Sequence, residues 1–240
     1  PQTDEVIKQK YGTKSADLRA INKLDLQRVF NLENNPEIPI LAYSGRLDKQ
    51  KGLDLFIKEF EYIINDLGAQ IVVLGGGERS YVEFFSEMTK KYPGRVGTHL
   101  MRDFTLPRKI FAGADMLLIP SKYEPGGIIA IEALRYGCIP VVRATGGLAD
   151  SVINYDFKTD KGYGFTFKQF SPEGLLTGVI RAIETYKNQT VWKRIVKRAM
   201  QMDFSWKKSA QKYVDLYKKS IESHQENLSP NTNIDRPLYS

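Results

Sequence analysis

Residues 116–142, MLLIPSKYEPGGIIAIEALRYGCIPVV, contain the pattern that decides the fold. Residues 116–119 and 139–142 are short, continuously apolar runs, and residues 128–136 between them have a helical pattern. Apolar runs of this length are typical of strands that are covered on both faces. A strand, a helix and a second strand in this order predict two parallel strands joined by a crossover helix.

The same alternation continues toward the N-terminus. Apolar runs at residues 39–44 and 70–74 predict two further strands, and residues 81–91 predict a helix that stops before Pro93. A longer helix is predicted by apolar residues at three- and four-residue spacing, namely Leu53, Phe56, Ile57, Phe60, Ile63, Ile64 and Leu67. The sequence therefore predicts an α/β fold, a Rossmann-like doubly wound parallel sheet with helices on both faces.

The two ends of the chain differ from this central region, and we divide the sequence into four segments. Residues 1–36 are a polar, linker-side segment with one helix, and residues 37–203 are the Rossmann-like domain. Residues 204–224 are a closing helix, and residues 225–240, rich in Asn, Pro and Ser, are expected to be disordered on their own. Helical patterns outside the alternating region cover residues 21–30, 172–186, 191–200 and 206–221.

Composition excludes several classes of protein. Of the 240 residues, 42% are hydrophobic and 26% charged, as in an ordinary globular protein. No run of about 18 apolar residues and no secretory leader occurs, so we expect no membrane span and no secretion. Cys138 is the single cysteine, and with only His99 and His224 it builds neither a disulfide nor a zinc site. We therefore expect the cytoplasm or at least a reducing compartment.

The net charge of +7 is concentrated near the C-terminus, where residues 181–240 carry twelve basic and six acidic residues. Such an excess fits either a nucleic-acid-binding face or the solvated sides of two amphipathic helices. No recognised nucleic-acid motif accompanies the charge, so we expect no nucleic-acid partner.

The segments that follow the strands are the most informative for function, because doubly wound folds bind ligands at the carboxyl ends of their strands. After the first strand, Gly45 and Gly52 bound a loop that contains Arg46 and Lys51 and opens a helix. A guanidinium that binds oxygens in pairs, a compact ammonium and the positive end of a helix dipole suit a diphosphate. A solvated turn is the alternative.

The segment after residues 70–74 carries a weaker signal. Gly75, Gly76 and Gly77 allow the backbone to approach a ligand closely, but a turn with positive φ explains them equally well. The segment is not a Gly-x-Gly-x-x-Gly fingerprint, since Ser80 stands at its third position, and the sequence has no P-loop.

Residues 120–132 give the strongest signal. Glu124 precedes a Pro-Gly-Gly turn, and a helix begins immediately, so free backbone amides at residues 127–129 are expected to point into the crevice. Glu132 lies inside that helix. Amides bind phosphate and carboxylates bind sugar or ribose hydroxyls, so the pattern favours a nucleotide sugar. The alternative is an acid at a helix N-terminus plus one solvated Glu.

A similar segment follows residues 139–142. Thr145 is placed to cap the next helix, and Gly146 again permits close approach. No Asp-x-Asp pair occurs, so we expect no metal to hold a diphosphate. Arg46, Lys51 and helix dipoles would then neutralise a leaving diphosphate.

Several motifs together resemble the bacterial and plant glycogen and starch synthases. They are Ser44-Gly45-Arg46…Lys51-Gly52-Leu53-Asp54, Glu124-Pro125-x-Gly127, Leu134-Arg135-Tyr136-Gly137, Pro140-Val141-Val142-Arg143-x-Thr145-Gly146-Gly147-Leu148-Ala149-Asp150 and Phe204-Ser205-Trp206…Ser209-Ala210. The resemblance covers roughly residues 1–222 in order. It implies the C-terminal half of a two-Rossmann-domain (GT-B) retaining glycosyltransferase that moves glucose from ADP-glucose to an α-1,4-glucan and releases ADP.

The resemblance also implies roles for particular residues. Arg46 and Lys51 would stabilise the leaving diphosphate, and Glu124 would lie by the transferred glucose. Glu132 completes a Glu-x7-Glu pattern in which the second Glu binds ribose. The nucleotide-sugar site would further include Gly45, Gly75, Gly76, Arg102, Phe104, Gly126, Gly127, Ile128, Ile129, Thr145 and Gly146. No further cofactor is implied. For a protein from a plant or alga, the resemblance implies the plastid stroma as its compartment.

Three departures from the family's pattern concern the donor. The family usually has Cys at the position of Gly126 and Thr-Gln at Ile129-Ala130. It often has an aromatic residue that stacks on adenine at the position of Arg102, where Phe104 is close by and the Arg102 guanidinium offers a stacking plane. These departures leave open a donor domain that uses a UDP- or GDP-sugar.

The family's N-terminal domain, with its Lys-x-Gly-Gly loop and acceptor-side histidine, has no counterpart in this sequence. Pro at position 1 indicates a fragment or a processed chain. We therefore expect this chain to be inactive alone and to need the N-terminal domain and a glucan acceptor. A non-catalytic nucleotide- or glucan-binding module is the remaining alternative.

Overall fold

A single parallel sheet forms the centre of the molecule in the computed structural model, which describes residues 1–228 and the side chains of residues 1–225. The sheet has six strands in the order β3-β2-β1-β4-β5-β6, with every neighbouring pair parallel. The strands are β1 (Ile40–Ser44), β2 (Gln70–Leu74), β3 (Val96–His99), β4 (Met116–Ile119), β5 (Ile139–Arg143) and β6 (Phe165–Phe167). This order confirms the predicted doubly wound fold.

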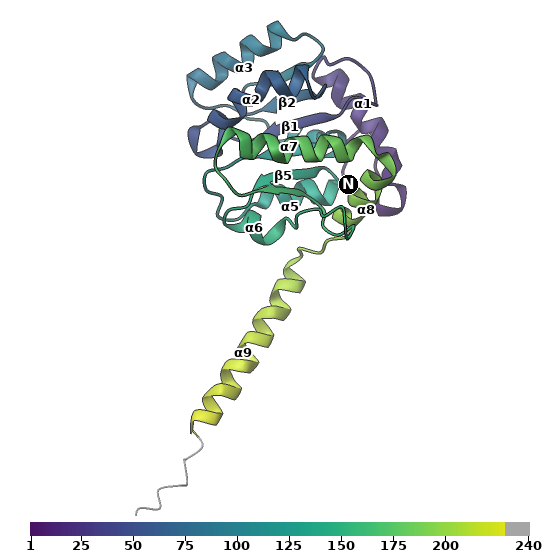
Figure 1. Cartoon of the computed structure of the whole chain (residues 1–240). Coiled ribbons are helices and arrows are strands. Elements are labelled where there is room, and N and C mark those ends of the chain that lie inside the picture. The colour runs from purple at the N-terminus through teal and green to yellow at the C-terminus, as the bar shows by residue number, and fades with distance from the viewer. Residues whose placement is uncertain (229–240) are drawn as a thin grey trace, which may run out of the picture. The chain divides into compact units, whose positions relative to one another are not determined.

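Helices cover both faces of the sheet (Figure 1). On one face α1 (Arg19–Val29) packs on α4 (Leu106–Gly113), and α4 packs on α5 (Ile128–Tyr136). On the other face α2 (Leu53–Asn65) contacts both α7 (Pro172–Lys187) and the rings of α3 (Arg79–Lys91). The shorter elements are η1 (Thr13–Leu18), η2 (Lys49–Lys51), α6 (Gly147–Ser151) and α8 (Gln189–Met200).

The sheet is buried because its strands are apolar along their whole length. β2 and β4 are buried at every residue, and in β1 and β5 the last residue alone is partly exposed. The three rings of Phe56, Phe60 and Phe85 are fully buried and pack together with centroids 5.3 to 6.1 Å apart. Burial of each such ring contributes about 1.5–3 kcal/mol.

Two strands, β3 and β6, one α-helix, α4, and the short helices η1 and η2 were not predicted from the sequence. β3 and β6 are the two edge strands, and β3 contains Gly97 and two partly exposed residues, so neither has the continuous apolar run of a central strand. Gly97 stands there because a Cβ would lie 2.5 Å from the carbonyl oxygen of Phe30. α4 is short and carries Pro107 in its first turn.

By its contacts the chain divides into two compact units, residues 1–202 and the rest of the chain from Asp203. The second unit contains α9 (Trp206–Leu228). Residues 225–228 belong to this helix, so the prediction that they are disordered is wrong, because the helical pattern continues past the expected end. Residues 229–240 of the predicted tail lie outside the described residues. Among the described helices, none has both the length and the apolar character that crossing a bilayer requires.

Candidate functional site

The candidate site lies where β1 and β4 run side by side at the centre of the sheet. The chain leaves β1 toward β2 and leaves β4 toward β5, on opposite sides, so the loops that follow these two strands diverge. In open α/β sheets such a switch point creates a crevice at the carboxyl ends of the strands. The loop after β1 carries Arg46 and Lys51, and the loop after β4 carries Glu124.

Lys51 and Glu124 form an ion pair across this switch point. Lys51 Nζ lies 2.7 Å from Oε2 of Glu124, and the two side chains are 22% and 14% exposed. Ser121 Oγ donates to the same carboxylate oxygen at 3.2 Å. The sequence predicted both charged residues in the site but not their contact. The structure thus places an ammonium and a carboxylate together, each with one side toward solvent.

The position of Lys51 is set by its own loop and by the loop after β4. Asp48 Oδ1 accepts from the backbone amide of Lys51 at 3.0 Å and caps η2. The backbone amide of Lys122 donates to the carbonyl of Gln50 at 2.8 Å, which ties the two loops together. Because its backbone is fixed from both sides, Lys51 presents its side chain to Glu124 without a loop rearrangement.

Arg46 lies in the same loop but is held less firmly. Its Nη1 is 3.1 Å from Oδ2 of Asp48, and its side chain is 68% exposed. Its carbonyl accepts a hydrogen bond from the Tyr43 hydroxyl, so the backbone is fixed while the guanidinium extends toward solvent. An exposed ion pair of this kind contributes about 0–1 kcal/mol, so an anionic ligand could take the guanidinium from Asp48 at little cost.

The N-terminus of α5 follows Glu124 directly. Gly127 is the N-cap, and within the described residues the helical bonding begins with Ala130, whose amide donates to the Gly127 carbonyl at 2.9 Å. The amides of Gly127, Ile128 and Ile129 therefore belong to the unbonded first turn, where the helix dipole is positive. Ile128 is 69% exposed, which leaves this end of the helix open to solvent.

The loop after β5 braces the loop that carries Glu124. The amide of Gly147 donates to the carbonyls of Glu124 and Pro125, each at 3.1 Å. Gly146 has φ +48°, and a Cβ there would lie 2.3 Å from the carbonyl oxygen of Glu124. Glycine is therefore required by close packing between the two loops. The predicted cap by Thr145 is wrong: Gly146 is the N-cap of α6, and Thr145 contributes only its carbonyl, which accepts from Leu148.

The loops after β1, β2 and β3 also meet. Gly45 and Gly75 approach so closely that a Cβ on Gly75 would lie 1.8 Å from the Gly45 carbonyl oxygen. A Cβ on Gly76 would lie 3.6 Å from the Cα of Met101, next to Arg102. Loop packing therefore requires glycine at position 75, whereas a Cβ on Gly76 would make only ordinary van der Waals contact with the β3 loop, which lies beside the β2 loop.

Arg102 and Phe104 form a cation–π pair at the end of the sheet. The guanidinium carbon of Arg102 lies 4.6 Å from the centroid of the Phe104 ring, which is 74% exposed. Asp103 between them accepts from the amides of Thr105 and Leu106, and these hydrogen bonds hold the pKa of its carboxyl below the usual range. The loop thus holds a planar cation and an aromatic ring in contact and open to solvent.

Glu132 lies one helical turn after Ile128 and therefore on the same side of α5. The residue as a whole is exposed, yet desolvation raises the pKa of its carboxyl above the ordinary value. A carboxyl in partly desolvated surroundings, one turn into the helix, is suited to accept hydrogen bonds from hydroxyl groups.

Two residues near the site were missed from the sequence, Ser121 and Arg143. Arg143 Nη1 donates to the carbonyl of Lys122 at 2.7 Å, and its guanidinium lies 5.4 Å from the Phe170 ring. Ser121 is fully buried and bonds Glu124. A polar residue near the end of each buried strand was the available signal, but the partners of Ser121 and Arg143 are set by the three-dimensional contact of two loops.

Comparison with known proteins defines the class to which this fold and site belong. The family model described as "Glycosyl transferases group 1" matches residues 27–199. The match spans the whole sheet together with the loops that carry Arg46, Lys51 and Glu124. The chain belongs to the group 1 glycosyl transferases.

Within this family the chain is similar to proteins named glycogen synthase. It is 40% identical over 224 residues to the one from Syntrophotalea carbinolica and 42% identical over 221 residues to the one from Desulforamulus reducens. These matches cover 93% and 92% of this chain but 46% of each relative. The chain thus spans about half the length of the curated relatives it matches.

A solved structure extends this similarity to the fold. The catalytic domain of starch synthase IV from Arabidopsis thaliana, bound to ADP and acarbose, superimposes with a TM-score of 0.83 at 33% identity. The match covers 92% of this chain and 46% of that one. Sucrose-phosphate synthase from Thermosynechococcus elongatus, at 23% identity and a TM-score of 0.59, shares the fold.

Proposed function

We propose that this chain is the nucleotide-sugar-binding half of a retaining glucosyltransferase that extends an α-1,4-glucan with ADP-glucose as donor. The observation that carries the proposal is the convergence of Lys51, Glu124 and the open N-terminus of α5 at the switch point between β1 and β4. The similarity to glycogen synthases and to an ADP-bound starch synthase supports the choice of donor and of glucan.

Each group has a role that its chemistry suits. The unbonded amides of Gly127, Ile128 and Ile129 would bind the distal phosphate, since helix N-termini bind anions. Lys51 and Arg46 would face the diphosphate and neutralise the negative charge that develops as its bond to glucose breaks. These cations stabilise the leaving group without a metal ion, in keeping with the lack of an Asp-x-Asp pair.

The carboxylates would orient the sugars. Glu124, fixed by Lys51 and Ser121, would lie by the transferred glucose, where its charge also stabilises an oxocarbenium-like transition state. Glu132 would bind the ribose hydroxyls, and the pair of Arg102 and Phe104 would offer a surface for the base. The acceptor would attack on the face from which ADP departs, which retains the anomeric configuration.

The other half of the active site is proposed to come from an N-terminal domain, since the relatives are about twice as long as this chain. The proposed acceptor, the non-reducing end of an α-glucan, would then enter between the two domains. On this proposal the chain alone binds donor but does not transfer glucose.

The test is transfer of glucose by the full-length protein that contains this chain, with ADP-, UDP- and GDP-glucose offered separately to an α-1,4-oligoglucan. We expect chain extension with ADP-glucose, retention of the α-configuration, and no extension by residues 1–240 alone. Faster transfer from UDP- or GDP-glucose than from ADP-glucose would show that the proposed donor is wrong. If none of the three donors supports transfer, the chain is a non-catalytic binding module instead.

A further inference from the structure

A pocket lies at the amino ends of the strands, on the opposite side of the sheet from the loops that form the candidate site. Its volume is about 470 Å³, and its wall is formed by η1, α1, α8 and the segments that precede β1 and β4. Asp115, at its base, is the residue before β4, and its Oδ2 accepts from the amide of Ile40 at the start of β1. The pocket therefore opens at the amino ends of the strands, away from the loops that carry Lys51 and Glu124.

The base of this pocket holds two cations and one carboxylate. Lys23 Nζ lies 2.8 Å from Asp115 Oδ2 and donates to the Tyr186 hydroxyl at 2.8 Å. Arg19 is 9% exposed, and its Nη2 donates to the neutral carbonyl of Ala114 at 2.6 Å. Because Asp115 is already neutralised by Lys23, the buried guanidinium of Arg19 has no carboxylate of its own within ion-pair distance in the described chain.

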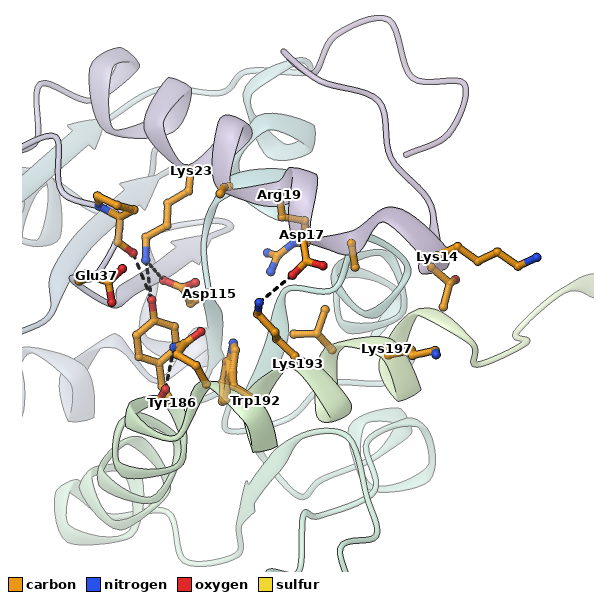
Figure 2. A pocket seen from close by; sticks show the side chains of 17 residues that line it. Lys14, Asp17, Arg19, Lys23, Glu37, Asp115, Tyr186, Trp192, Lys193 and Lys197 are labelled. Carbon is orange, nitrogen blue, oxygen red and sulfur yellow. Dashed lines mark hydrogen bonds and ion pairs between the residues drawn. The ribbon is translucent and has the colours of Figure 1, made fainter.

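Two buried donors in the wall also lack acceptors. Nε of Arg19 and Nε1 of Trp192 have no hydrogen-bond partner among the described residues. Buried donors without partners cost about 1–3 kcal/mol each, so both are unusual features of a folded protein. In Figure 2 the Arg19 guanidinium and the Trp192 side chain extend toward the middle of the pocket from α1 and α8.

The mouth of the pocket is crossed by an ion pair. Lys193 Nζ lies 2.9 Å from Oδ1 of Asp17, and the two side chains are 66% and 77% exposed. Arg19 lines the same pocket as this pair, and in Figure 2 the side chains of Lys14 and Lys197 extend away from the pair. A ligand anion could displace the Asp17 carboxylate from Lys193 at little free-energy cost, because exposed ion pairs are weak.

We propose that this pocket binds the phosphate group of a small organic phosphate. Lys23 is paired with Asp115 and Lys193 with Asp17, so among the described residues Arg19 is a buried cation of the lining without a carboxylate partner. A phosphate monoester, which carries about −1.5 to −2 charges at neutral pH, would supply the missing anion. The phosphate would contact Arg19 and Lys193, and the organic body would lie against the apolar wall beside Trp192 and Val196. The site is separate from the donor site, so both can be occupied at once.

Trp192 offers a local reporter for the test, since the chain has only one other tryptophan, Trp206. In the Trp206→Phe variant the single indole N–H signal in a ¹H–¹⁵N spectrum comes from Trp192. We expect ribose 5-phosphate to shift this signal saturably with a Kd of about 1 mM or lower. Ribose without the phosphate is the matched ligand and is expected to leave the signal in place.

Two exposed residues test the charge argument in opposite directions. Lys193→Gln is expected to weaken binding by about threefold to tenfold, and Asp17→Asn to tighten it, because the first removes a cation and the second its competitor. Lys90→Gln on α3 removes an exposed lysine elsewhere and is expected to leave the Kd unchanged. Arg19→Met is expected to abolish saturation in a chain that retains its circular dichroism spectrum.

The proposal is overturned by any of three results. One is an unmoved Trp192 signal at concentrations about tenfold above a millimolar Kd. Another is an equal shift with ribose alone, and the third is the same Kd for Lys193→Gln, Asp17→Asn and the parent chain. None of these outcomes bears on nucleotide binding at the carboxyl ends of the strands, so the two proposals fail independently.

Discussion

Lys51 Nζ lies 2.7 Å from Oε2 of Glu124, although the two residues are 73 positions apart in the sequence. The contact exists because β1 and β4 are neighbours in the sheet while their loops lead to different strands. It places the cation proposed for the leaving diphosphate against the carboxylate proposed for the glucose. Donor binding at this site would insert between charges that are already positioned, and this requires little reorganisation.

Replacing Lys51 by Ala in the full-length protein is expected to lower kcat by about 100-fold or more, because it removes a preorganised group that stabilises the leaving diphosphate. Lys49→Ala is the matched control, since Lys49 is an exposed lysine of the same loop whose side chain makes no hydrogen bond or ion pair in the described structure. Initial rates at saturating ADP-glucose measure the effect. An unchanged kcat for Lys51→Ala would contradict the role of this residue.

Gly146→Ala is expected to weaken nucleotide binding to this chain by about tenfold or more, because the added Cβ would meet the Glu124 carbonyl oxygen at 2.3 Å and displace the loop. Gly68→Ala is the control for backbone strain alone. Gly68 also has positive φ, +72°, but nothing lies within 4 Å of its added Cβ. Gly68→Ala is expected to lose about 1–2 kcal/mol of stability from the φ penalty. Gly146→Ala is expected to lose more, because Gly146 combines φ +48° with ψ −136°, outside the left-handed helical region. Equal ADP affinities for the two variants would show that the 146–147 contact does not shape the site.

Phe104→Ala is expected to weaken binding of ADP by about tenfold and that of inorganic pyrophosphate hardly at all, since the ring would contact the base and not the phosphates. Phe104→Tyr, which keeps an aromatic face, is expected to restore ADP affinity. Competition binding of the two ligands measures the difference. A parallel loss for ADP and pyrophosphate would place this ring away from the base.

The thiol of Cys138 is expected to be unreactive in the folded chain. Burial raises its pKa to about 12, against an ordinary value of about 8.5, so the native state keeps the thiol protonated. As the pH rises, the unfolded state therefore loses this proton at a lower pH than the folded state does. The stability contributed by the neutral thiol is fully present below about pH 8.5 and falls as the pH rises toward 12.

Two measurements test this expectation. Labelling by a disulfide reagent at pH 8 is expected to be about 10³-fold slower in the folded chain than in urea. Between pH 7 and 10 the urea midpoint is expected to fall more for the parent chain than for Cys138→Ala, which isolates this group from the tyrosines. Fast labelling without denaturant would mean that the β5 strand opens locally.

The sequence was sufficient to predict the four central strands and most helices, because each is a continuous apolar run or a periodic apolar face. It was not sufficient for β3 and β6, whose edge positions tolerate Gly97 and partly exposed residues. The distinction follows from burial: apolar patterning is strict only where both faces of a strand are covered.

For the site, the sequence identified the loops but not their mutual contacts. Residue type and position after a strand were enough to select Arg46, Lys51 and Glu124. Two contacts depend on how the loops after β4 and β5 fold against each other. They are the hydrogen bond from the Gly147 amide to the Glu124 carbonyl and the hydrogen bond from Arg143 to the Lys122 carbonyl. Thr145 shows that residue type alone can mislead: threonine is suited to capping, but it lies one position before Gly146, which is the N-cap of α6.

The most direct test of the central claim is calorimetric titration of this chain with ADP, UDP and GDP, first without metal and then with magnesium. We predict binding that is selective for ADP, independent of magnesium, and lost or weakened at least about tenfold in Arg46→Ala and Lys51→Ala. Undiminished ADP binding by both variants, or a clear preference for UDP or GDP, would contradict the assignment of this crevice as an ADP-glucose site.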